Sequence, residues 1–129
     1  MPMVADGRPD AKRPKDRRRA EKRGHAAEYL AAVFLMLKGY RILALRYRTK
    51  VGEVDIIARK RDLVAIIEVK ARSTEMVAIE AVSASSQNRI RSAADIWVSR
   101  RPDAAGLSMR FDVIAILPWR LPRHFKAAF

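Results

Sequence analysis

The chain has 129 residues, 50% of them hydrophobic, with no cysteine and a formal net charge of +13. This length is typical of one domain with its own core, and the lack of cysteine excludes disulfides, zinc–thiolate sites and a cysteine nucleophile, as in cytoplasmic proteins. The positive charge predicts a polyanionic partner, either nucleic acid or an anionic membrane.

The N-terminal residues 1–21 predict a disordered basic arm, since three prolines and the run Lys12–Arg19 leave little to bury. A solubilising leader and an arm that grips DNA are both compatible with this composition. The folded domain is then expected over 22–129. Its longest apolar run, Tyr29–Leu37, is far shorter than the roughly 20 residues that span a bilayer, so no membrane partner is expected.

A first helix is predicted from about 22 to 38 and ends at Gly39, a typical C-cap residue. Glu28 lies at the edge of its apolar stripe, where its carboxylate can reach the end of a sheet. The alternative is a first-turn glutamate favoured by the helix dipole. The stripe expected to be buried consists of Ala27, Leu30, Ala31, Phe34 and Leu37.

Three strands are expected next, over 41–48, 53–59 and 63–70, the last two forming a hairpin. The tip is either Arg61-Asp62 or a longer loop from Lys60 to Leu63. With the two-residue tip, residues 55 and 68 face each other, as do residues 53 and 70.

Charged side chains gather at the open end of this hairpin, on one face, because side chains alternate along a strand. Asp55 would lie opposite Glu68, and Glu53 opposite Lys70. Facing carboxylates destabilise a sheet unless a cation lies between them, and oxygen ligands suit Mg²⁺ or Mn²⁺. Lys70 could hold a scissile phosphate or orient a water. The alternatives are solvated edge charges and, for Glu53, a plain cross-strand ion pair.

The remaining chain is expected to form a loop or weak turn over 73–82, a helix over 84–100, a strand over 109–117 and a short helix toward Phe129. Asp112 within the last strand is interpreted as structural. The element order of helix, three strands, helix and strand favours an α/β fold with an αβββαβ core.

These motifs carry a resemblance. Asp55 followed by Glu68-Val69-Lys70 resembles the PD-(D/E)xK nuclease signature, with Val54 in place of the proline. From Gly24 onward the chain also resembles the uncharacterised bacterial YraN-like family of that superfamily. The matching segments are 24–28, 52–55, 68–72, 110–115 and 125–129.

The resemblance implies a restriction endonuclease-like three-layer αβββαβ core, with a central mixed sheet flanked by helices. It also implies a Mg²⁺- or Mn²⁺-dependent endonuclease acting on DNA, with branched DNA or recombination and repair intermediates as candidate substrates. Asp55, Glu68 and the Val69 carbonyl would bind the metal, Lys70 would position the attacking water and Glu28 would complete the acidic shell. Glu53 and Gln87 are expected accessories, although Gln87 equally fits a solvated first turn. The residues expected to hold phosphates are Lys50, Arg72, Arg89 and Arg91.

Two alternatives stay open at this point. The same fold could serve as a nucleic-acid-binding module without cleavage, since fold does not define function. RNA could replace DNA as the partner, and a homodimer would suit symmetric cutting of a junction.

Overall fold

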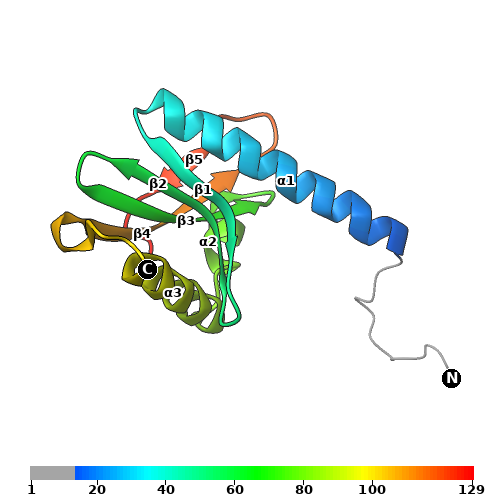
Figure 1. The fold of residues 1–129 in the computed structure, drawn as a ribbon. Coiled ribbons are helices and arrows are strands. Elements are labelled where there is room, and N and C mark those ends of the chain that lie inside the picture. Colours follow the sequence, from blue (N-terminus) through cyan, green and yellow to red (C-terminus); the bar gives the residue numbers. More distant parts are fainter. Residues whose placement is uncertain (1–13) are drawn as a thin grey trace, which may run out of the picture.

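The structure, a computed structural model, describes residues 14–129; among residues 14–23 it describes only the side chains of Arg18 and Lys22. Two long helices lie on either side of a mixed sheet (Figure 1). The elements in chain order are α1 Pro14–Leu37, β1 Arg41–Arg48, β2 Glu53–Lys60, β3 Leu63–Ala71, α2 Glu75–Glu80, α3 Ala84–Ser99, the 3-10 turn η1 Ala104–Gly106, β4 Ser108–Ile116 and β5 Arg123–Phe125.

The sheet has five strands in the order β1-β2-β3-β4-β5. Only the β3–β4 pair is parallel, and this connection passes through α2 and α3, because parallel neighbours need a long crossover. The β2–β3 register pairs Lys60 with Leu63, which leaves Arg61-Asp62 as the tip. Arg61 has a φ of +58°, the left-handed conformation that tight two-residue hairpins require. Of the two tips that the sequence left open, the structure has the two-residue one.

Both faces of the sheet are buried by a helix, because its central strands are apolar on both sides. On one face α1 packs Ala27, Ala31, Ala32 and Leu35 against Ile56, Ala58, Ala65 and Ile67. On the other face α3 packs Ile90, Ala93, Ala94 and Trp97 against Val54, Ile57, Val64 and Ile66. The result is a mixed α/β arrangement in which helices sandwich the sheet (Figure 1).

The first helix differs from its prediction in two ways. It begins at Pro14 rather than near residue 22, so residues 14–21 of the expected arm are helical, and residues 1–13 lie outside the described part. Proline suits the first position of a helix, where its missing N–H is not needed. The buried stripe is also shifted: Leu30 is 55% exposed and Leu37 83% exposed, while Ala32 and Leu35 are buried, because the sheet contacts the side of the helix that carries Ala32 and Leu35.

Two further segments correct the sequence prediction. The stretch 73–82, expected to be a loop, contains α2, whose first turn is capped by the Thr74 hydroxyl accepting from the Val77 N–H. The chain after β4, expected to form a short helix, instead forms β5 and pairs antiparallel with β4. His124 of β5 reaches the buried Asp112 at 2.8 Å, and this contact favours the strand. No helix within residues 14–129 is both long and apolar enough to cross a membrane.

The β1–β2 turn lies directly against α3. A Cβ atom at Gly52 would overlap the carbonyl oxygen of Arg89. We expect Gly52→Ala to lower the free energy of unfolding by about 1–3 kcal/mol in urea denaturation, because the overlapping atom is rigid backbone. Gly24→Ala is the matched control: nothing lies within 4 Å of its Cβ, and alanine in α1 should stabilise by roughly 0.5–1 kcal/mol. Equal stability of both variants would disprove the close contact.

Candidate active site

The candidate site lies where β2 and β3 separate. Their pairing ends at Ile56 and Ile67; beyond it β2 pairs only with β1 and β3 only with β4. Asp55 and Glu68 are the next residues on the two strands, as the predicted register requires. The Val69 N–H donates to Asp55 Oδ2 at 2.8 Å, and this bond takes the place of a backbone hydrogen bond between the two strands. The Asp55 carboxylate therefore lies in the opening between β2 and β3, which we call the fork.

A cavity of about 260 Å³ opens at this fork. The β2–β3 hairpin supplies three carboxylates to its wall, and α3 supplies a cation and a hydroxyl. The lining residues are Glu53, Asp55, Glu68, Ser86, Arg89 and Ile90. The structure thus brings together three predicted acidic residues and the predicted phosphate-binding Arg89. Ser86 was not predicted, since a serine near a helix start reads as capping.

The carboxylate pair is electrostatically strained. Burial raises the pKa of Asp55 to about 8, with the neighbouring Glu68 carboxyl acting in the same direction, against the opposing Val69 N–H and Lys70. Two buried carboxylates in contact cannot both ionise cheaply unless a cation or a proton lies between them. A cation bound at the fork would therefore stabilise the ionised forms of Asp55 and Glu68.

Lys70 lies beside this pair. Its Nζ is 3.9 Å from Glu68 Oε2, and both side chains are mostly buried. Glu53, predicted to face Lys70, instead has Arg48 of β1 as its cross-strand partner, with Oε1 3.6 Å from Arg48 Nε. The fork explains this difference, because β2 leaves β3 at that point and keeps β1 as its only neighbour.

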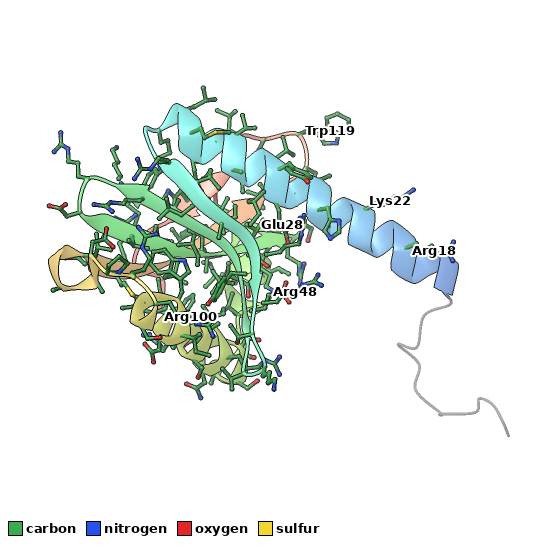
Figure 2. The ribbon with its side chains drawn as sticks, in the orientation of Figure 1. Arg18, Lys22, Glu28, Arg48, Arg100 and Trp119 are labelled. Carbon is green, nitrogen blue, oxygen red and sulfur yellow. The ribbon has the colours of Figure 1, made fainter. Side chains whose placement is uncertain are left out.

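Glu28 brings a further carboxylate from α1, on the side of the helix that faces the sheet (Figure 2). Burial raises the pKa of Glu28, the hydrogen bond from Arg46 lowers it and the Asp55 charge raises it again. Arg46 Nη1 donates to Glu28 Oε1 at 2.8 Å. Arg46 was not among the predicted site residues, because its position in an apolar strand does not stand out in the sequence. Its φ of +50° is a strained conformation of the kind found at functional sites.

The other predicted residues lie apart from the cavity lining. Gln87 donates its amide to the Val82 carbonyl at 3.2 Å, and Arg91 lies over the Phe111 ring at 4.5 Å. Lys50 in the β1–β2 turn and Arg72 after β3 are exposed. Of the four predicted phosphate-binding cations, only Arg89 lines the cavity.

The oxygens available to a metal come from few residues. Within residues 14–129 no group of three or more histidine, cysteine, aspartate or glutamate side chains is arranged to hold an ion. Asp55 and Glu68, with the main-chain carbonyl of Val69, remain the candidate ligands. Two carboxylates completed by waters and phosphate oxygens fit Mg²⁺, which keeps much of its hydration in proteins.

The strain at Asp55 predicts a stability effect. A carboxyl whose pKa is raised on folding destabilises the fold progressively as pH rises from its unfolded value of 3.8 to about 8. We expect Asp55→Asn to raise the free energy of unfolding by about 1–3 kcal/mol at pH 9 without metal, and the gain to vanish near pH 4. Urea denaturation across this range measures it. A gain that is independent of pH would contradict the assignment.

The fold and this cluster define a mixed α/β protein with a carboxylate pair and a lysine at a fork in its sheet. Residues 27–116 match the Uncharacterised protein family UPF0102, and the chain belongs to this family. It is 61% identical over 127 residues to a UPF0102 protein of Agrobacterium fabrum strain C58, covering 98% of this chain and all of the relative. A UPF0102 protein of Rhizobium johnstonii is 62% identical over 113 residues, covering 88% of this chain and 93% of the relative. These names assign no reaction.

Proposed function

We propose that this protein is a metal-dependent endonuclease of the PD-(D/E)xK superfamily, with a restriction endonuclease-like core. The observation that carries the proposal is the largely buried Asp55–Glu68 pair with Lys70 beside it. A protein built only for stability gains nothing from placing two carboxylates together in a fork between apolar strands. Such strained titratable groups in a cavity are typical of functional sites.

The site residues divide into clear roles. Asp55, Glu68 and the Val69 carbonyl would hold Mg²⁺ or Mn²⁺, which supplies Lewis-acid activation of the phosphodiester and of water. Lys70 would orient the attacking water and stabilise negative charge that develops on the phosphate. The Val69 N–H fixes the orientation of Asp55.

Residues around the fork support the same chemistry. Glu28, fixed by Arg46, would hold a water near the Asp55 side of the fork. Arg89 in the cavity wall would bind a neighbouring phosphate, and Glu53 and Ser86 would bind waters in the same cavity.

The substrate that we propose is DNA, and RNA is the alternative that the assay below tests. The net charge of +13 favours contact with many phosphates. The described residues present no helix whose side chains form an obvious base-reading surface, so selection by DNA structure, such as a branch or flap, is favoured over selection by sequence. Two symmetric cuts in one junction would require a homodimer.

A non-catalytic nucleic-acid-binding module on the same fold is the second candidate. The observation that favours it is that no third metal-binding side chain joins the pair within residues 14–129. In that case the carboxylates would serve only to repel or orient the bound strand.

The experiment that separates the two functions is incubation of the purified protein with branched, flapped, nicked, linear and single-stranded DNA and RNA. Each substrate is tested with Mg²⁺, with Mn²⁺ and with EDTA. A nuclease cuts at least one substrate with metal and none with EDTA. Binding without cutting across the whole panel would refute the nuclease and support the binding module.

A further inference from the structure

A second, larger cavity lies at the opposite end of β3. Its volume is about 590 Å³, and it is lined by Tyr40, Lys60, Arg61, Asp62, Leu63, Ser108, Arg110 and Lys126. Leu63, in the wall of this cavity, begins β3, whereas Glu68, in the wall of the first cavity, lies near the other end of the strand. Five residues of strand separate them, about 17 Å at ~3.3 Å per residue. The two cavities are therefore distinct sites.

The charge in this second cavity is strongly unbalanced. Four of the lining residues are cations, and Asp62 is the only carboxylate among them. The Asp62 side chain is 84% exposed and lies nearest to Arg59, outside the lining. Among the side chains that the structure describes, the ion pairs of this region involve Arg59, Asp62 and Asp103, and none includes Lys60, Arg61 or Lys126. Like charges gathered without counter-charges are unfavourable, and a bound anion would relieve them.

The pKa of a neighbouring lysine is lowered by the same group of cations. Burial lowers the pKa of Lys38, and the charges of Lys126, Arg110 and Lys60 lower it further. The Asp112 charge acts in the opposite direction and raises the pKa of Lys38. Because Asp112 is fully buried beneath Arg110, it neutralises the floor of the cavity but not its mouth.

The floor of the cavity is rigid. Arg110 donates Nε to Asp112 Oδ1 at 2.8 Å and Nη2 to Asp112 Oδ2 at 2.7 Å. Nη2 also donates to the Tyr40 hydroxyl at 2.8 Å. Lys60 is held by donating to the Lys38 carbonyl at 2.9 Å and lies 5.4 Å from the Tyr40 ring centre. Cations fixed in this way bind an anion without first losing side-chain entropy.

We propose that this cavity is a phosphate-binding site, separate from the carboxylate site. Phosphate matches the lining because ammonium groups, a guanidinium and the Ser108 hydroxyl are its usual donors in proteins. The phosphate can come from the backbone of a nucleic acid strand or from a small phosphorylated molecule. The same donors would bind a phosphate from either source, so the experiment below compares one probe of each kind.

The test uses the full chain in EDTA, so that its outcome is independent of metal binding and cleavage at the other site. The probes are inorganic pyrophosphate, followed by calorimetry, and a fluorescent single-stranded DNA of 12 nucleotides, followed by anisotropy at constant salt. The variant is Lys60→Gln with Lys126→Gln. The control is Lys22→Gln with Arg100→Gln, which removes the same charge from exposed positions at other places on the surface (Figure 2).

We expect the double variant to bind the responsive probe about tenfold more weakly than the control, since two charged hydrogen bonds are lost. The single Lys126→Gln, at an exposed position, should weaken it about threefold and guards against misfolding. If the double variant binds pyrophosphate more weakly than the control does, the ligand is a small phosphorylated molecule. If only its affinity for the DNA is lower, the ligand is the backbone of a nucleic acid strand. Equal affinity of variant and control for both probes, or no binding of either probe to the wild type, would overturn the proposal.

Discussion

Glu68→Gln is expected to lower metal-dependent DNA cleavage by about 10²–10³-fold or more, in the assay that detects cutting by the wild type. The amide keeps the size of the side chain but removes one of the two charged groups that we propose as metal ligands. Binding of the same DNA in EDTA should be unchanged or stronger, because a negative charge near the phosphate is lost. Gel shift beside a cleavage time course measures both.

Lys70→Ala is expected to affect cleavage and DNA binding differently from Glu68→Gln. Cleavage should be lost to a similar degree, while binding weakens only moderately, since one phosphate contact among several disappears. The control for Glu68→Gln is Glu80→Gln, the same substitution at an exposed position at the end of α2. This control should cut like the wild type. Wild-type cutting rates in both Glu68→Gln and Lys70→Ala would exclude the fork as the catalytic centre.

Asp112→Asn is expected to cost about 3–5 kcal/mol of folding free energy, a large share of the roughly 5–15 kcal/mol of a typical domain. Asp112 is 0% exposed and accepts from Arg110, His124 and the Ala127 N–H. An amide would turn an N–H₂ group toward these donors and leave the Arg110 charge uncompensated. Heat and urea denaturation should show this loss.

The pH dependence of Asp112 has the opposite sign to that of Asp55. Burial opposes ionisation of Asp112, but the bonds from His124 and Arg110 and the Ala127 N–H together lower its pKa to about 2. Its stabilising contribution is present above the unfolded value of 3.8 and is lost as pH falls toward 2. Asp103→Asn is the control: Asp103 pairs with Arg59 at the solvent-exposed surface, and its loss should change stability far less than the loss of Asp112. Similar losses in both variants would show that Asp112 is not the anchor that the geometry indicates.

Local patterns were enough to predict most of the elements. Two short apolar runs on either side of a polar turn predicted the β2–β3 hairpin and its register, and a 3.6-residue apolar pattern predicted α3. The hairpin register in turn placed Asp55 beside Glu68, because two residues at the tip leave only one pairing. These features depend on contacts within about 20 residues of chain, which sequence patterns report directly.

The remaining differences come from long-range contacts. The strand β5 forms where a helix was expected: there His124 lies 2.8 Å from the Asp112 carboxylate of β4 and 2.7 Å from Nζ of Lys38, which is 86 residues earlier in the chain. The shifted stripe of α1 reflects the shape of the sheet beneath it, and the sequence of the helix alone carries no information about that shape. Gln87 and Arg91 were expected near the site, but α3 directs one to the Val82 carbonyl and the other to Phe111.

For the candidate site, the sequence by itself determined the acidic pair and the lysine, since their spacing on a hairpin sets which side chains share a face. Only the tertiary structure decided that β2 and β3 part at Asp55, that Glu53 turns to Arg48, and that Glu28 is held by Arg46. Only it assembled the cationic cavity at the far end of β3, from segments spread between residues 40 and 126. The physical reason is that burial, and with it the strength of every charge interaction, depends on which distant segments exclude water from a group.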